Sequence, residues 1–337
     1  MKLTAEQLLS IAWGAVRIQE EDGGLCLHRF TEEQSAYYER ADEDFYFKSR
    51  AASGARLVFR TDSRTLSMTA VISRAVKRRF FAFEVYVDGT FIGSMDNYDG
   101  VIFGDKYDLI DLPWGRFSKE FALGDGEKTV MIYLPWAQRL VLEDISLEDG
   151  ASLIPVRRNK TLMVYGDSIT QGYDALWPSH RYTSRLADAL RAEELSKAIG
   201  GEVFNPSLAK LKDPEEPDYI LVSYGTNDWE KTTWEVFSQN CPAFFRTLCS
   251  NYPHARIFVL TPIWRKHHME QHECGAFAGI ADYIRQSAAF SPNVSIHEGF
   301  YFVPADETWF SDGRLHPNEK GIASFFENLW NSIQPTL

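Results

Sequence analysis

The spacing of hydrophobic residues changes near residue 150, and this change constrains the fold more than any other feature of the chain. Before it, apolar and polar residues alternate with a period of two, which is typical of strands with one buried face. Asp88-Gly89 supplies a favoured hairpin turn. Many short strands between turns predict a β-sandwich of the jelly-roll type over residues 1–155, after a helix near residues 5–13. The predicted strands include residues 57–60, 66–72, 81–87, 90–92, 130–134 and 140–142.

Residues 156–337 have a different pattern, in which continuous apolar runs alternate with helical stretches. Apolar strands between helices indicate a parallel sheet that is covered on both faces. The sequence therefore predicts an α/β domain after the sandwich. The expected strands are residues 162–165, 219–222 and 257–260, and the expected helices include residues 182–192 and 322–333.

Composition narrows the class of protein. The 337 residues carry a formal charge of −12, which argues against nucleic acid or an anionic membrane as a partner. No apolar run approaches the roughly 20 residues of a membrane span, and we see no export signal near the first residue. The four cysteines lie far apart without metal-ligand spacing. These observations predict a globular protein of the cytoplasm with reduced thiols; a homo-oligomer is left open.

Two residues have the chemistry and the context of a nucleophile and its base. Ser168 lies just after an apolar strand, at the edge where open α/β sheets place their ligands. The Gly-x-Ser-x-Gly elbow of another hydrolase fold is missing, because the fifth position is Thr170. A serine hydroxyl needs a base, and His316, followed by Pro317 at a helix start, is the candidate. A serine in this place can also simply cap a helix. The prediction of a nucleophile therefore depends on Ser168 and His316 occurring together.

Acyl transfer also needs donors for the negative oxygen that forms on the substrate carbonyl. Three candidates are the backbone N–H groups of Ser168 and Gly201 and the side-chain amide of Asn227. Asn227 follows a predicted strand and so shares an edge with Ser168, although Gly-Thr-Asn-Asp also suits a simple turn. Gly200 is an alternative register for the glycine.

The segments Gly166-Asp167-Ser168-Ile169, Gly201, Gly225-Thr226-Asn227-Asp228 and His316-Pro317 resemble, in order, the four signature blocks of the SGNH (GDSL-like) hydrolases. The resemblance covers residues 161–337. It implies a flavodoxin-like three-layer α/β/α sandwich. It also implies that Ser168 is the nucleophile and His316 the general base, with Ser168 N–H, Gly201 N–H and Asn227 as the oxyanion hole.

One position departs from the family pattern. These hydrolases usually have aspartate three residues before the histidine, but here that residue is Gly313 and the nearest carboxylate is Asp312. Gly313 could absorb the extra residue, so that Asp312 still reaches Nδ1 of His316. Otherwise a backbone carbonyl orients the ring. We therefore include Asp312 as the third catalytic candidate.

A jelly-roll domain before an SGNH domain is also similar in layout to the carbohydrate esterases of family two. That resemblance implies removal of acyl groups, acetyl groups above all, from a carbohydrate-like ester. The alternatives are a lipase or lysophospholipase-like acylhydrolase and a non-catalytic carbohydrate-binding protein. The predicted partner is a small-molecule or oligosaccharide ester.

Aromatic and polar residues beside the blocks are candidates for substrate binding. An aromatic ring next to a hydrogen-bonding group suits stacking on a sugar. His267, His268 and His272 resemble a metal cluster, but they lack the order of a zinc protease and are better explained as a solvated loop. We expect no metal and no cofactor. The substrate-binding candidates are Tyr173, Trp229, Trp264 and Arg265.

Overall fold

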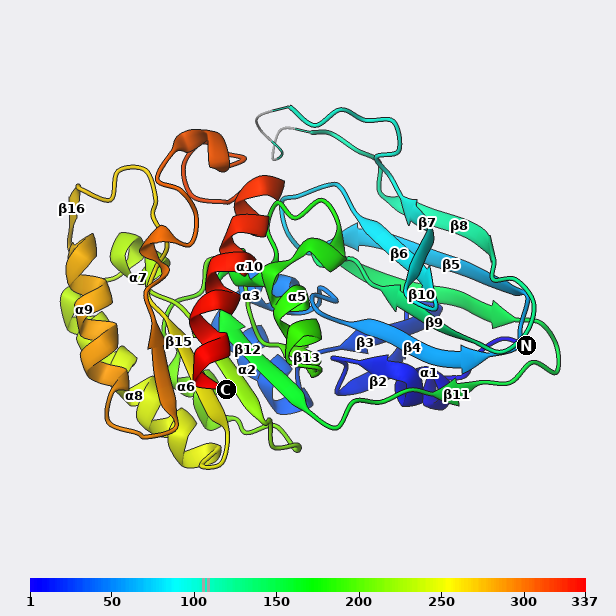
Figure 1. The fold of residues 1–337 in the computed structure, drawn as a ribbon, viewed down its shortest axis with the longest axis horizontal. Coiled ribbons are helices and arrows are strands. Elements are labelled where there is room, and N and C mark those ends of the chain that lie inside the picture. The colour runs from blue at the N-terminus through cyan, green and yellow to red at the C-terminus, as the bar shows by residue number, and fades with distance from the viewer. Residues whose placement is uncertain (105–106, 108–109) are drawn as a thin grey trace.

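A computed structural model describes residues 1–104, 107 and 110–337 of the chain. Its first part is rich in antiparallel strands and its second part holds a parallel sheet between helices, which confirms the predicted fold class (Figure 1). The boundary that we expect at residues 155/156 stays a prediction. The strand β11, Ile154–Pro155, still pairs with the first part, and β12 begins the second at Thr161.

Two antiparallel sheets form the first part. One has the strand order β1-β4-β9-β6-β7, with β11 beside β4, and the other has the order β2-β3-β10-β5-β8. The alternating apolar residues that the sequence predicted to be buried, such as Phe59, Met68 and Val85, form one core between the sheets. The predicted hairpin turn joins β6 to β7, and both of its residues, Asp88 and Gly89, have positive φ. The strands are β1 Ala12–Trp13, β2 Arg17–Glu21, β3 Gly24–His28, β4 Arg56–Thr61, β5 Thr65–Arg74, β6 Ala82–Val87, β7 Thr90–Asp96, β8 Gly115–Ala122, β9 Lys128–Tyr133 and β10 Gln138–Leu147.

The second part is built on a parallel sheet of five strands in the order β13-β12-β14-β15-β18. Neighbouring residues of each strand face opposite layers. Leu162 packs with the helices α5 and α10, while Met163 packs with α6, α8 and α9. Because the sheet is covered on both faces, its strands are apolar throughout. The strands are β12 Thr161–Gly166, β13 Glu193–Ser196, β14 Tyr219–Ser223, β15 Arg256–Leu260 and β18 Val294–His297, with a hairpin of β16 Gln271–His272 and β17 Gly275–Ala276. The helices are α4 Ser168–Gln171, α5 Tyr182–Ala189, α6 Pro206–Lys210, α7 Thr226–Lys231, α8 Trp234–Asn251, α9 Phe277–Ala288 and α10 Glu319–Ile333.

The described residues of the first part also form the helix α1, Ala5–Ile11, which the sequence predicted, and the helices α2, Glu32–Ala41, and α3, Glu43–Ser49, which it did not. The second and third lie against the parallel sheet rather than against the sandwich (Figure 1). Tyr38 of α2 is completely buried there. Helical residues from the first part therefore complete the core of the second.

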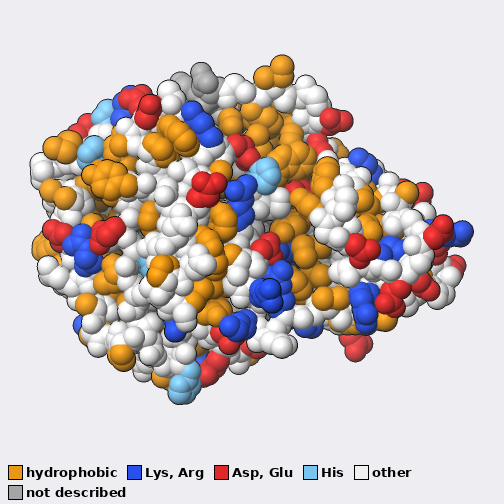
Figure 2. Space-filling view, viewed as in Figure 1, with side chains coloured by type: hydrophobic (Ala, Val, Ile, Leu, Met, Phe, Trp, Pro, Cys, Tyr) orange, Lys and Arg blue, Asp and Glu red, His pale blue; other side chains and the backbone are white. Residues whose placement is uncertain are grey.

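Buried polar contacts hold the two parts together. The guanidinium of Arg29 donates to the carbonyl oxygens of Ser196 (2.9 Å) and Ala198 (2.8 Å), at the end of β13. The buried ammonium of Lys197 pairs with Asp213 (2.6 Å) and donates to the carbonyl of Arg29 (2.6 Å). Figure 2 shows hydrophobic side chains gathered where the two parts meet. A buried charge that loses its partner is strongly destabilising, so this contact fixes the relative position of the two parts.

Candidate active site

Ser168 lies just beyond the carboxyl end of strand β12, as the first residue of the short helix α4. Asp167 caps this helix, and its Oδ1 accepts the N–H of Ile169 at 3.0 Å. Gly166 is needed for the tight turn, because a Cβ there would lie 2.4 Å from the hydroxyl of Thr170. The local sequence thus turns the chain sharply and leaves Ser168 at the edge of the sheet.

The loop before α10 brings His316 to Ser168. The distance from Nε2 of His316 to Oγ of Ser168 is 2.9 Å, and that from Nδ1 to Oδ2 of Asp312 is 2.8 Å. A carboxylate only accepts hydrogen bonds, so Nδ1 carries the proton and Nε2 is free to accept the proton of the serine hydroxyl. The ring also stacks on Tyr173, with 5.4 Å between ring centres.

Asp312 does more than contact the imidazole. Its Oδ1 accepts the backbone N–H groups of Arg314 (2.9 Å), Leu315 (2.7 Å) and His316 (3.1 Å). Gly313 has a φ of +63°, a conformation that glycine adopts without strain, and the loop closes back on the carboxylate through it. Burial opposes ionisation, but the hydrogen bonds from His316 and the backbone hold the pKa of Asp312 well below its usual range. Asp312 is therefore an anion near neutral pH.

The three predicted oxyanion donors belong to residues that line the same cavity. The N–H groups of Ser168 and Gly201 donate to no acceptor within the part of the chain that the structure describes. Gly200 differs, because its N–H donates to Oε1 of Gln171 at 2.7 Å. This occupied N–H favours Gly201, whose φ of +93° suits glycine, over the alternative register. The Nδ2 amide of Asn227, at the start of α7, donates to the carbonyl of Glu202 at 3.1 Å and is thereby oriented.

Two buried acids, Glu202 and Asp228, form hydrogen bonds around the segment that precedes and contacts Asn227. Oε1 of Glu202 accepts hydrogen bonds from the hydroxyl of Tyr38 (2.7 Å) and from Asn205 (2.9 Å), and burial raises the pKa of Glu202 to about 7. Asp228 accepts the N–H of Phe204 at 3.1 Å, and burial raises its pKa to about 7. Since Tyr38 belongs to α2, the first part of the chain helps to position the backbone that holds Asn227.

Ser168, Gly201, Asn227 and His316 line one open cavity of about 410 Å³. Among the described residues, twelve others line this cavity; six of the twelve come from the first part and six are basic, a grouping that sequence analysis missed. A signal was present, because residues 74–79 contain four basic residues just after a predicted strand. The basic lining residues are Lys48, Arg74, Lys77, Arg78, Lys231 and Arg314.

The structure separates the four predicted substrate-binding residues. Tyr173 lines the cavity, but Trp229, Trp264 and Arg265 are not among its lining residues. These three are only 1%, 9% and 3% exposed. Arg265 stacks on Trp229 and pairs with Glu230 at 2.8 Å, which fixes α7 rather than facing the cavity.

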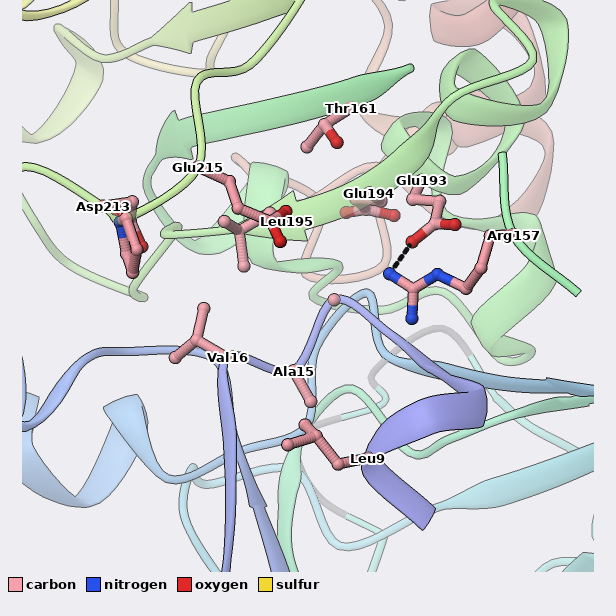
Figure 3. Close-up of a pocket in the computed structure, with 12 residues that line it drawn as sticks. Leu9, Ala15, Val16, Arg157, Thr161, Glu193, Glu194, Leu195, Asp213 and Glu215 are labelled. Carbon is pink, nitrogen blue, oxygen red and sulfur yellow. Dashed lines mark hydrogen bonds and ion pairs between the residues drawn. The ribbon is translucent and has the colours of Figure 1, made fainter. Parts of the chain in front are cut away.

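A different cavity, of about 480 Å³, lies at the opposite ends of β12 and β13 (Figure 3). Val16 and Leu9 approach it from the first part, and the ion pair of Arg157 with Glu193 (2.6 Å) closes one side. Thr161, the first residue of β12, lines it, whereas Ser168 follows the last residue of that strand. This cavity is therefore separate from the residues predicted to be catalytic.

The three histidines of the predicted loop do not converge. His267 approaches Glu270 (3.0 Å), while the ring of His268 packs against Phe300. Within residues 1–104, 107 and 110–337, no group of three or more histidine, cysteine, aspartate or glutamate side chains has the arrangement of a metal site. None of the helices in this described part is both long enough and apolar enough to cross a membrane.

A serine hydroxyl, an imidazole and a carboxylate in sequence form the arrangement that serine hydrolases use. Residues 164–323 match the model of the GDSL-like Lipase/Acylhydrolase family, and this segment belongs to that family. The match confirms the resemblance seen in the sequence and identifies the chain as a carboxylic ester hydrolase. No curated protein matches the chain by sequence.

Solved structures match nearly the whole chain. A salicylyl-acyltransferase, SsfX3, from a tetracycline biosynthetic pathway is 20% identical, with a TM-score of 0.78 over 96% of this chain and 94% of that one. A family two carbohydrate esterase from Clostridium thermocellum is 14% identical, with a TM-score of 0.66 over 96% and 98%. One from Cellvibrio japonicus is 17% identical, with a TM-score of 0.64 over 100% and 99%. At these identities the likeness establishes the shared fold, sandwich included.

Proposed function

We propose that this chain is a serine esterase that removes a short acyl group, acetyl above all, from a carbohydrate-like ester. The observation that carries the proposal is the 2.9 Å contact between Oγ of Ser168 and Nε2 of His316, with Asp312 behind the ring. The contact lies in a cavity that is open to solvent and reachable by a substrate. Nucleophile and base are thus within the range that proton transfer requires.

The first step is acylation of the enzyme. His316 removes the proton of the Ser168 hydroxyl, and the serine oxygen forms a bond to the acyl carbon. The N–H groups of Ser168 and Gly201 and the amide of Asn227 stabilise the negative oxygen; each such donor contributes about 2.7–4 kcal/mol to transition states of this kind. The bond to the alcohol then breaks, and the imidazolium gives its proton to the leaving oxygen.

The second step releases the acyl group. His316 removes a proton from a water molecule, whose oxygen attacks the acyl-serine carbonyl. The same donors hold the second oxyanion. When the bond to Ser168 breaks, the imidazolium returns a proton to the serine oxygen and a carboxylic acid leaves. Asp312 remains ionised throughout and stabilises the imidazolium in both steps.

The lining of the cavity favours a short acyl group over a fatty chain. Most of its side chains are charged or polar, and its apolar members are few: Val76, Tyr173 and Leu315. A lipase needs an extended apolar surface for its acyl chain. Some similar structures are described as carbohydrate esterases, one in complex with cellohexaose, and another as an acetyl xylan esterase. These descriptions support an acetylated carbohydrate.

The test is hydrolysis of 4-nitrophenyl acetate and 4-nitrophenyl dodecanoate by the wild-type chain and by Ser168→Ala. We expect turnover of the acetate, a lower kcat/KM for the dodecanoate, and loss of both activities in the variant at unchanged thermal stability. Ser295→Ala, a serine of β18 that is outside the cavity, is the matched control. Wild-type activity in Ser168→Ala would refute the proposed nucleophile. A protein that binds sugars, lacks esterase activity and is not labelled by a fluorophosphonate would instead be a binding protein.

A further inference from the structure

The mouth of the cavity around Ser168 has a charge opposite to that of the molecule. The whole chain carries a formal charge of −12, yet among the residues that the structure describes, six basic and two acidic side chains line this cavity. The two acids are Asp44 and Glu230. A local reversal of charge in a cleft attracts a ligand of opposite charge, because the low-dielectric walls focus the field.

Both acids are already neutralised. Asp44 forms an ion pair with Lys48, one turn further along α3. Glu230 pairs with the buried guanidinium of Arg265 at 2.8 Å. Among the basic residues, Arg78 is held by both carboxylate oxygens of Asp174, at 2.6 and 2.9 Å. Both acidic side chains that line the cavity within the described residues therefore already have a basic partner.

Four cations of the lining form no ion pair with a carboxylate in the described part of the chain: Arg74 at the end of β5, Lys77 after it, Lys231 at the end of α7, and Arg314 near His316. Arg74, Lys77 and Arg314 are exposed at the mouth. The four cations come from three separate segments, so the concentration of charge is a property of the folded cavity and not of one basic run.

Two ammonium groups lie beside the proposed oxyanion glycine. Nζ of Lys48 donates to the carbonyl of Gly200 (2.7 Å), and Nζ of Lys231 donates to that of Gly201 (3.2 Å). Burial, followed by the positive charge of Lys48, lowers the pKa of Lys231. The repulsion between these amines costs energy in the free protein, and a bound anion would relieve it.

We infer that the ester substrate carries a negatively charged group, a carboxylate or a phosphate, which binds at the mouth of the cavity between Arg74, Lys77 and Arg314. This inference rests on the proposed esterase function and narrows its substrate class. An acylated acidic sugar or sugar phosphate has the required chemistry. A neutral polysaccharide would leave these cations without a partner.

The test compares three acetate esters that differ in one substituent: phenyl acetate, 3-carboxyphenyl acetate and 3-(phosphonooxy)phenyl acetate. Released acid is titrated at low salt, and kcat/KM is measured for the wild type and for the double variant Arg74→Gln/Lys77→Gln. The quantity compared is kcat/KM for each anionic ester divided by kcat/KM for phenyl acetate. When this ratio is compared between variants, the intrinsic reactivity of each ester cancels. The control is Arg40→Gln/Lys210→Gln, which removes an exposed arginine and lysine outside the cavity.

We expect the ratio for at least one anionic ester to fall about tenfold in the double variant, and to fall in the wild type when salt is added. The ester with the larger fall tells carboxylate from phosphate. A change below about threefold for both anionic esters, or an equal change in the control, would overturn the inference while leaving the esterase intact. Absence of wild-type activity on all three esters would overturn the proposed function itself, and the inference with it.

Discussion

The substitution Asp312→Asn tests most directly how the histidine is oriented. Asparagine has the shape of aspartate, and its Oδ1 can keep the three backbone N–H groups of the loop. Its Nδ2 amide, however, replaces the oxygen that lies 2.8 Å from Nδ1 of His316. Two donors then face each other unless the imidazole moves its proton to Nε2, and in that tautomer it cannot accept the proton of Ser168.

The expected loss can be estimated from other serine hydrolases. The corresponding change in a serine protease lowers kcat about ten-thousand-fold by fixing the wrong tautomer, which corresponds to about 5.4 kcal/mol in the transition state. We expect a kcat lower by about a thousandfold or more here. KM should change little, because Asp312 is not among the residues that line the cavity.

The assay is the steady-state hydrolysis of 4-nitrophenyl acetate by the wild type, Asp312→Asn and the control Asp306→Asn, which alters an exposed carboxylate in the same region. Asp312→Ala is measured beside them by thermal unfolding, since it also leaves backbone donors without an acceptor, at about 1–3 kcal/mol for each buried group. If Asp312→Asn retains a kcat within about tenfold of the wild type, the carboxylate does not orient the ring and a dyad explains the site better.

Three further predictions concern the surroundings of the site. Asn227→Ala should lower kcat for an acetate ester by about a hundredfold or more, because one oxyanion donor is lost; an unchanged kcat would remove Asn227 from the mechanism. The raised pKa of Glu202, about 7 against about 4.5 in the unfolded chain, means that its contribution to stability is lost as pH rises from about 4.5 to 7. The free energy of unfolding, measured with urea, should therefore fall between pH 5 and pH 8 by about 3 kcal/mol more in the wild type than in Glu202→Gln. An equal fall in both proteins would contradict the burial argument. Residues 156–337 expressed alone should neither fold nor hydrolyse esters, as seen by circular dichroism and activity, because the core then lacks Tyr38; a folded, active fragment would contradict this.

The regular elements of the second part could be predicted because each is recorded in the local sequence. The runs at 219–222 and 257–260 became β14 and β15, and the apolar stripe at 322–333 became α10. The helices α2 and α3 were missed although a capping pair, the N-cap Thr31 with Gln34 in the first turn, marks the start of α2. Their buried face meets residues more than 150 positions away, such as Glu202. A local sequence pattern cannot indicate a contact with a residue so far away in the chain.

Some residues of the candidate site could likewise be predicted from the sequence, and others could not. Ser168, Asn227 and His316 lie in short sequence motifs. The positions of the first two after predicted strands point to one edge of the sheet, and the structure does bring all three to one cavity. Trp229 lies only two residues after Asn227, but two residues on a helix correspond to a rotation of roughly 200°, so its side chain points into the core. Position at the edge of a sheet predicts where a residue lies, not where its side chain points.

The basic residues of the cavity could not be assigned from the sequence because they become a group only when the two parts meet. Arg74 ends strand β5 of the sandwich and Lys77 follows it. Lys48 lies in the last turn of α3, which packs against the core of the parallel sheet, and Arg314 lies two residues before the histidine. The second part supplies the reacting groups, while the first part supplies much of the charge around them. A change in the sandwich can therefore alter which ester is bound without touching the serine or the histidine. In the proposed site, the first part of the chain therefore contributes to substrate choice through Arg74 and Lys77, whereas the proposed reacting groups all come from the second part and follow a recognisable motif.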